Sequence, residues 1–283
     1  MGTYYPRNTW DVVFYAIKNE PCWLTVEGVD EPIKLSDNSI CVLPHGHAHA
    51  IQDIVRTEAV PVKKYRPDGY YGLMRYGGIE GSPTFVYFGG FSLDRSSKNP
   101  LWEALPPVIH IHYKQTPSWL EPVFSWFRDE LTERKLGYDS IASRLGELLI
   151  IESIRMYIQE SADLGAGWIN ALRDPQLLKV LNLIHANVER PWTVEALAAE
   201  VGLSRSRLAA RFSAQLNEGP LHYLAYWRMQ RAAALLRDTS LSIPTIVQTV
   251  GYQSEPSFNA AFKRVFGKPP GRFRQETRQT ETA

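Results

Sequence analysis

The last third of the chain contains one short pattern twice, and this repeat constrains the fold more than any other feature. In the first copy, residues 193–201 have the apolar spacing of a short helix, Gly202 follows, and Ser204 precedes a second helical run. Leu208 and Phe212 fall on one face of that run. Glycine readily takes the left-handed conformation that ends a helix, and serine is a good helix N-cap. The pattern therefore predicts two short helices joined by a tight turn.

The second copy follows a long helical run over residues 221–238. Residues 243–250 form its first helix, Gly251 its turn, and Phe258 and Phe262 the inward pair. Two helices joined by a glycine-containing turn are typical of a helix-turn-helix, whose second helix enters the major groove of DNA. One such pair also occurs in enzymes, but two in tandem predict a nucleic-acid-binding domain.

The charge of the chain is divided unevenly. Residues 174–283 contain 14 Lys or Arg and 9 Asp or Glu, a net charge of +5, whereas the whole chain has +1 and the remainder therefore −4. A basic segment favours a polyanionic partner, although a solvated basic face would have the same composition. The charge thus supports double-stranded DNA as the partner without establishing it.

The region from residue 10 to 113 has a different pattern. Short runs rich in β-branched and aromatic residues, such as 11–17, 40–43 and 84–88, alternate with turn residues. Many short strands at close spacing predict an antiparallel β-barrel or sandwich. Two amphipathic helices are expected next, at 120–131 and 141–156.

The apolar face through Leu145, Leu148 and Ile151 has two interpretations. It either covers the β domain or forms an isologous homodimer contact. Glycines and Asp-Pro predict a linker over 163–175. The chain is therefore expected to be a multidomain α+β protein. Its expected parts are a sensing and dimerisation domain at 1–165, an all-α DNA-binding domain with two helix-turn-helix units at 174–275, and a flexible tail at 276–283.

The stretch from Gly251 to Arg274 resembles the signature of the AraC/XylS family of bacterial transcription regulators nearly throughout. The first half resembles the cupin-type sensor domain common in that family. The residues that carry this second resemblance are Leu43-Pro44-His45-Gly46-x-x-His49 and Gly89-Gly90-Phe91-Ser92-Leu93-Asp94, running into Pro100-Leu101 and Leu105-Pro106.

This sequence departs from the sensor pattern at two places. Asn38-Ser39 stands where those proteins usually have Gly-Asp, and Phe88-Gly89 where many have Cys-Gly. Asparagine tolerates the left-handed conformation, so the turn at Asn38 is expected to survive. Thiol-based sensing at position 88 is put in doubt.

The resemblance implies a sequence-specific DNA-binding regulator, usually an activator, that works with RNA polymerase. It also implies control by a small-molecule effector bound in the N-terminal β-barrel. Candidate ligand-binding residues are His45, His49, Trp23, Phe14 and Phe88. The sequence has no secretory signal and no apolar run of about 18 residues, so a cytoplasmic protein without membrane contact is expected. A DNA binder that needs no ligand is an alternative.

The residues expected to contact DNA lie opposite the inward pairs. The resembled family places base contacts at Ser206, Ala209 and Ala210. Because these side chains are small, the specific hydrogen bonds are expected from Arg205 or Arg207, with Arg205 preferred. The remaining basic groups would hold phosphates. The full set of expected DNA-contact residues is Arg205, Ser206, Arg207, Ala209, Ala210, Arg211, Glu255, Pro256, Ser257, Asn259, Ala260 and Lys263.

Two of these residues allow a more specific reading. Asn259 could pair with adenine, and Glu255 could accept a hydrogen bond from cytosine. Alternatively, Glu255 only caps or starts its helix, where a carboxylate suits the helix dipole.

The histidines and cysteines are candidates for metal binding and for sensing oxidants. His45, His47 and His49 are spaced two apart, so on a strand they could share a face and hold a metal, or else brace a loop by hydrogen bonds. Cys22 and Cys41 are either thiolate sensors or small buried apolar residues.

No cofactor is expected. The sequence has no Gly-x-Ser-x-Gly motif and no phosphate-binding loop, so catalysis is not expected. A cupin-type metalloenzyme fused to DNA-binding helices is the enzymatic alternative.

Overall fold

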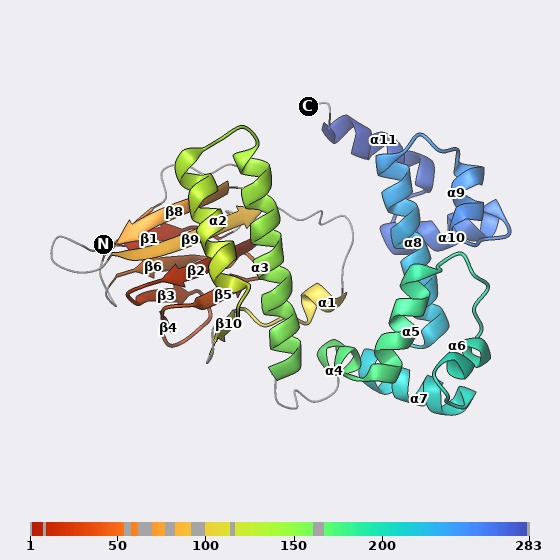
Figure 1. Ribbon diagram of the computed structural model, residues 1–283. Coiled ribbons are helices and arrows are strands. Elements are labelled where there is room, and N and C mark those ends of the chain that lie inside the picture. The colour runs from red at the N-terminus through yellow and green to blue at the C-terminus, as the bar shows by residue number, and fades with distance from the viewer. Residues whose placement is uncertain are drawn as a thin grey trace. The chain divides into compact units, whose positions relative to one another are not determined.

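The computed structural model describes residues 2–7, 10–53, 58–61, 70–76, 83–91, 100–113, 117–160 and 167–281. The chain divides into two compact units (Figure 1). One contains residues 1–95 and 101–161, and the other contains residues 96–100 and 162–283.

The described residues of the first unit form two five-stranded sheets. One has the order β4 (Ile33–Leu35), β3 (Cys22–Val26), β6 (His49–Gln52), β1 (Gly2–Tyr5) and β7 (Ala59–Pro61). The other has the order β10 (Ile109–His112), β5 (Ser39–Leu43), β2 (Val12–Lys18), β9 (Thr84–Phe91) and β8 (Tyr70–Tyr76). Neighbouring strands are antiparallel except β1 and β7, which are parallel.

Of the barrel and the sandwich expected from the sequence, the structure shows the sandwich, with two sheets packed face to face. Across the described strands, no pairing joins the two sheets. Alternate residues of facing strands meet in one buried core instead, including Tyr15 and Ile17 of β2 and Cys22 and Leu24 of β3. A face-to-face sandwich buries the apolar side of each sheet without closing a barrel. The predicted β-rich region followed by helices is confirmed.

Two helices cover the other face of the second sheet: α2 (Leu120–Glu133) and α3 (Tyr138–Glu160). The short α1 (Pro100–Glu103) precedes β10. The ring of Phe14 on β2 contacts Phe127 of α2 edge to face, with centroids 6.0 Å apart. Gly146 of α3 lies so close to the sheet that a Cβ atom there would sit 2.7 Å from the Phe14 ring. The absence of a side chain at Gly146 thus lets α3 approach the sheet.

The apolar face of α3 is divided between the core and solvent. Leu145 is buried, whereas Leu148 is 43% exposed and Ile151 is 50% exposed. Leu145 therefore does not share the exposed face expected for a homodimer contact. Leu148 and Ile151 remain available for that contact, which stays a prediction.

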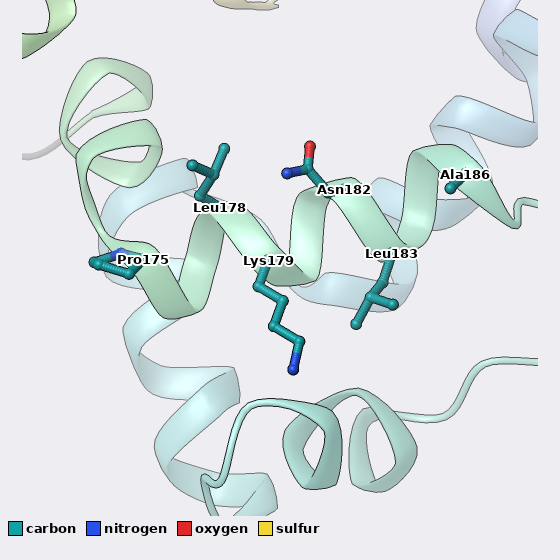
Figure 2. Close-up of a pocket in the computed structure, with 6 residues that line it drawn as sticks. All are labelled: Pro175, Leu178, Lys179, Asn182, Leu183 and Ala186. Atoms are coloured by element: carbon teal, nitrogen blue, oxygen red, sulfur yellow. The ribbon is translucent and has the colours of Figure 1, made fainter.

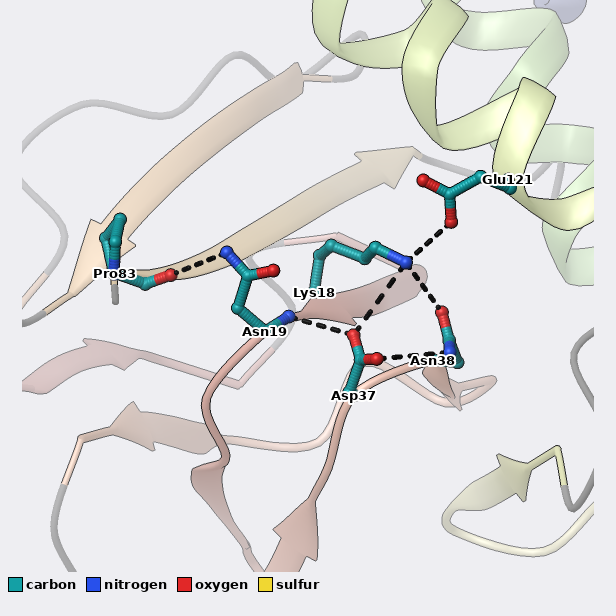
Figure 3. A network of polar contacts seen from close by, with 6 residues as sticks. All are labelled: Lys18, Asn19, Asp37, Asn38, Pro83 and Glu121. Carbon is teal, nitrogen blue, oxygen red and sulfur yellow. Dashed lines mark hydrogen bonds and ion pairs between the residues drawn. The ribbon is translucent and has the colours of Figure 1, made fainter. Parts of the chain in front are cut away.

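Lys18, at the end of β2, connects the sheet to α2 (Figure 3). Its ammonium group donates to Asn38 Oδ1 at 3.1 Å and pairs with Glu121 of α2 at 2.6 Å. Asp37 lies 3.9 Å from the same nitrogen and accepts from the backbone of Asn19. Asn38 has a φ of 58°, so it takes the left-handed conformation expected of this turn.

The second unit is helical. Its helices are α4 (Trp168–Arg173), α5 (Pro175–Ala186), α6 (Val194–Glu200), α7 (Arg205–Leu216), α8 (Pro220–Asp238), α9 (Ile243–Thr249), α10 (Glu255–Phe266) and α11 (Pro270–Glu281). Two separate cores form around them. Tyr223 and Leu224 of α8 belong to the first core, and Met229 and Leu236 belong to the second. α8 therefore serves both cores.

The structure differs from the sequence prediction at both ends of this unit. Residues 163–166 of the predicted linker lie outside the described residues, and its larger part, 167–175, contains α4 and the start of α5. The backbone of the predicted flexible tail continues α11 to Glu281. Glu276 pairs with Lys268 and Arg272, and Thr277 donates to the carbonyl of Phe273 at 3.0 Å. These contacts favour a helix where a tail was expected.

Candidate nucleic-acid interface

The first helix pair, α6 and α7, has the predicted capping. The Thr193 hydroxyl accepts from the backbone of Ala196 at 3.1 Å, and the Ser204 hydroxyl accepts from the backbone of Arg207 at 3.3 Å. These side chains satisfy backbone N–H groups that have no partner inside the helix. Gly202 takes a φ of 67° in the turn. The predicted helix-turn-helix is thus confirmed in its local geometry.

The second pair, α9 and α10, repeats this arrangement. Ser242 caps α9 by accepting from Thr245, and Ser254 caps α10 by accepting from Ser257. Gly251 has a φ of 77° in the turn between them. In both units the predicted inward residues are buried, and these are Leu208 and Phe212 on α7 and Phe258 and Phe262 on α10.

The opposite side of α7 contains five of the six α7 residues that are expected to contact DNA. Arg205, Ser206, Arg207 and Ala210 are exposed, and Ala209 is half-buried. The Arg205 guanidinium pairs with Glu195 of α6 at 2.8 Å while its side chain remains 70% exposed. Within the described part of the chain, Arg207 has no hydrogen bond or ion pair through its side chain. Both arginines are accessible to a ligand.

Arg211 is held by the protein itself. Its Nε lies 2.6 Å from Asp174 and its Nη1 donates to Gln176 at 2.7 Å. Asp174 also caps α5 by accepting from the backbone N–H groups of Gln176 and Leu177. Arg211 therefore fastens the recognition helix to the start of α5, a role that the sequence prediction missed because the partners are far apart in sequence.

On α10, the expected residues all lie on the exposed side of the helix. All six are exposed, and they are Glu255, Pro256, Ser257, Asn259, Ala260 and Lys263. Ser254 is the N-cap, so Glu255 occupies the first turn and is not the cap. Its carboxylate can favour the helix dipole or meet a base, and both interpretations stay open.

A shallow apolar pocket lies along α5, ahead of the first helix pair (Figure 2). It is lined by Pro175, Leu178, Lys179, Asn182, Leu183 and Ala186. The Lys179 ammonium donates to the backbone carbonyl of Glu200 at 2.5 Å. This contact fastens the end of α6 to α5 and supports the fold of the first helix pair.

In the N-terminal unit, the candidate histidines act as hydrogen-bonding residues. His49 is buried, and its Nδ1 contacts the carbonyl of His47 at 2.7 Å while its Nε2 contacts the Tyr15 hydroxyl at 2.7 Å. Since a carbonyl can only accept, Nδ1 donates and Nε2 accepts. Burial lowers the pKa of His49 to about 4. Nε2 of His45 contacts the carbonyl of Leu105 at 2.9 Å.

These bonds do not fit a metal site built on the three histidines. Both ring nitrogens of His49 are already occupied, so it would have to break a buried hydrogen bond to bind a cation. Across the described ranges, no three His, Cys, Asp or Glu side chains are grouped as a metal ion would require. The bracing interpretation of His45 and His49 accounts for their observed contacts.

The candidate ligand-binding aromatics are not brought together. Phe88 is buried between the sheets, 6.4 Å from the rings of Tyr5 and Tyr15. Phe14 lies on the opposite face of the sheet, under α2. Trp23 alternates with the buried residues of β3 and is only partly covered. An effector in contact with Phe88 would therefore not also contact Phe14 across the intact sheet.

Cys22 and Cys41 are free and buried. Burial raises the pKa of the Cys22 thiol to about 12, and the pKa of Cys41 is raised further for the same reason. Because the thiolate is the reactive form, both side chains are poorly suited to sensing oxidants in this conformation. Their positions fit the interpretation as small apolar core residues.

Comparison with known proteins agrees with this division. The model of the Cupin family matches residues 3–159, and that of the Helix-turn-helix domain matches residues 197–276. An AraC-like transcription regulator of Streptomyces lividans is 33% identical over 93% of this chain and 86% of its own. The chain belongs to the AraC family of transcription regulators. The HTH-type transcriptional regulator AlkR of Acinetobacter baylyi is also 33% identical, over 84% of this chain and 79% of its own.

The family assignment makes this protein an AraC-type DNA-binding transcription regulator with a cupin sensor domain. These relatives are regulators and not enzymes. The solved DNA-binding domain of AdpA, a global transcriptional factor, in complex with a target DNA is 26% identical to this chain. The match covers 38% of this chain and 96% of the AdpA domain, with a TM-score of 0.36. No helix among the described residues is long and apolar enough to span a membrane.

Proposed function

We propose that this AraC-family protein activates transcription by placing α7 and α10 in successive major-groove segments of a promoter. The observation that carries the proposal is the pair of capped recognition helices, each with its aromatic side buried and the opposite side exposed. Two such helices about one DNA turn apart (~34 Å) can reach the same face of the duplex. The basic charge of residues 174–283 supports a phosphate-rich partner.

Arg205 is the side chain that we expect to read a base through α7. Its guanidinium is exposed and oriented by Glu195, and arginine binds guanine with two parallel hydrogen bonds. Arg205→Ala should weaken binding to the selected operator by about 1–3 kcal/mol, or roughly 5- to 150-fold in Kd. It should also relax base preference at one position of the first half-site. Binding assays on operators substituted at each position measure both effects.

Arg207→Ala is the matched control, because Arg207 lies on the same helix and has no side-chain partner in the described part of the chain. If it holds a phosphate, its loss should weaken all sequences alike and flatten the dependence on salt. Unchanged affinity and unchanged base preference in Arg205→Ala would show that the assignment of Arg205 is wrong.

We further propose that the N-terminal unit binds a small-molecule effector and that binding changes transcription from the promoter. Support comes from the separate compact unit at residues 1–95 and 101–161 and from its match to the Cupin family. An effector can regulate only if it binds one conformation more tightly than another. In the full chain, an effector at 100 times its Kd should stabilise the unit that binds it by about 2.7 kcal/mol.

Thermal unfolding of the full chain with a library of small organic compounds tests this proposal. A compound that raises the melting temperature should also change transcription in a promoter assay at the same concentrations. A chain lacking residues 1–161 should lose this response. If the shortened chain responds like the full chain, the effector acts elsewhere and the sensor proposal fails.

A further inference from the structure

The long helix α8 changes its surroundings halfway along its length. Tyr223, Leu224 and the partly buried Trp227 pack in the first core, whereas Met229 begins the set of residues in the second core. Arg228 lies at this change. The helix has 19 residues and a length of about 28 Å at 1.5 Å per residue, so it spans both helix-turn-helix units (Figure 1).

The Arg228 side chain contacts both helix-turn-helix units. Its Nε donates to the carbonyl of Val188 at 2.7 Å and its Nη2 donates to the carbonyl of Arg190 at 2.9 Å. Both carbonyls belong to the segment between α5 and α6, in the first unit. The same guanidinium lies 5.8 Å from the ring centroid of Tyr252, in the turn of the second unit. A planar guanidinium presents several donors in fixed directions, which makes this contact directional.

The turn of the second helix-turn-helix unit also packs directly against the first helix-turn-helix unit. A Cβ atom built on Gly251 would lie 2.5 Å from the carbonyl oxygen of Glu189 and 2.9 Å from Arg228 Nη2. The glycine thus permits a close approach between the backbones of the two units. Gly202, the equivalent glycine of the first unit, has a similar φ but no atom within 4 Å of such a Cβ. Of these two turns, only the second packs this closely against another part of the chain.

We propose that Arg228, Gly251 and the carbonyls of residues 188–190 form a joint that fixes α7 and α10 at one separation and rotation. The joint makes the protein selective for the spacing between its two DNA half-sites. These residues are positioning residues, since they act on DNA through the recognition helices. The inference rests on the proposed function, in which both units contact DNA at once.

The selectivity for half-site spacing follows from bivalent binding. When both units engage one duplex, the second contact is intramolecular, and the gain over one half-site can reach about 100-fold or more if the geometry matches. A rigid joint confines that gain to one spacing. A loosened joint lowers the gain at the natural spacing and spreads it over neighbouring spacings, while each helix pair still binds its own half-site.

The experiment uses the full chain and the duplex that it selects from a random-sequence library. Derivatives carry one, two or five inserted base pairs between the half-sites, or a scrambled half-site. For the wild type, we expect insertions to weaken binding by at least tenfold. Gly251→Ala should lose about tenfold affinity at the natural spacing, keep its affinity for a single half-site within about twofold, and discriminate among spacings by less than about threefold.

Gly202→Ala is the matched control because both alanines are forced into a left-handed backbone conformation. It should retain the wild-type dependence on spacing. Arg228→Lys keeps the charge but loses the two-carbonyl contact, and it should shift spacing preference in the same direction as Gly251→Ala. This variant keeps the proposal testable if Gly251→Ala fails to fold.

Two results would overturn the joint while leaving DNA binding intact. The first is that Gly251→Ala and Arg228→Lys both lose as much affinity on duplexes with inserted base pairs as the wild type does. The second is an equal loss on single half-sites and on the full duplex, which would indicate damage to one helix pair and not to their spacing. A wild-type protein that binds a single half-site as tightly as the full duplex would instead contradict the two-unit function on which the inference rests.

Discussion

Phe212→Ala is expected to remove recognition of one half of the operator and leave the other half protected. Phe212 is fully buried at the centre of the first core, where its ring contacts Tyr223 with centroids 5.8 Å apart. Truncating a buried phenylalanine costs about 3–5 kcal/mol, which is a large share of the 5–15 kcal/mol that stabilises a typical domain. α7 should therefore lose its fixed position, while the second core around α10 contains other residues.

Phe258→Ala is the reciprocal variant, since Phe258 occupies the corresponding place in the second core. Footprints of the two variants on the same duplex should show protection lost at opposite half-sites, and calorimetry should show a lower unfolding temperature in both. Loss of the same half-site in both variants would contradict the assignment of one half-site to each helix pair.

Acidification is expected to destabilise the N-terminal unit through His49. Burial lowers the pKa of His49 to about 4, whereas an unfolded histidine titrates near 6.5. Between these values the unfolded chain binds more protons than the folded one, so the free energy of unfolding falls as the pH falls. The loss approaches about 3 kcal/mol by pH 4, at 1.36 kcal/mol per unit of pKa difference. Calorimetry of the full chain from pH 7.5 to pH 4 measures it.

His49→Gln isolates this contribution from those of other groups. Burial also lowers the pKa of His47 and His110 in the same unit, and these groups add to the slope in the same direction. Burial lowers the pKa of His185 as well, but His185 belongs to the helical unit. His49→Gln should lose stability at pH 7.5 and show a flatter pH dependence than the wild type. Tyr15→Phe removes the hydroxyl partner but keeps His49 buried, so it should retain most of the slope. Equal slopes in the wild type and His49→Gln would mean that His49 is not protonated on unfolding.

The parts of the fold predicted from sequence are those determined by neighbouring residues. Thr193 and Ser204 cap helices through backbone groups three positions away, and Gly251 ends a helix through its own φ. The left-handed turn at Asn38 depends in the same way on the residue itself. Such features need no knowledge of the rest of the chain, so pattern and residue type are sufficient.

The parts that were missed depend on residues far apart in sequence. The sequence does not indicate that β1 pairs with β7 in parallel, and it does not decide between a barrel and a sandwich. Arg211 was expected near phosphates because it lies on a recognition helix, yet Asp174 and Gln176 occupy its guanidinium. Likewise, nothing local to Arg228 indicates that its acceptors are the carbonyls of residues 188 and 190.

The candidate effector site shows the same limit. Phe14 and Phe88 are both buried aromatic residues on neighbouring strands, and composition alone cannot assign them to faces of the sheet. The register places Phe14 opposite Gly89 and Tyr15 opposite Phe88. Because side chains alternate across a strand, Phe88 joins Tyr15 in the core between the sheets, while Phe14 faces the helices. The candidate ligand-binding residues Phe14 and Phe88 thus lie on opposite faces of the sheet.

Hydroxyl-radical footprinting of the full chain on its selected duplex tests the central claim most directly. The account predicts two protected segments on one face of the DNA, centred about one helical turn (~10 base pairs) apart. Scrambling either half-site should remove one segment and weaken the other. A single protected segment, or two segments on opposite faces of the duplex, would contradict simultaneous reading by α7 and α10.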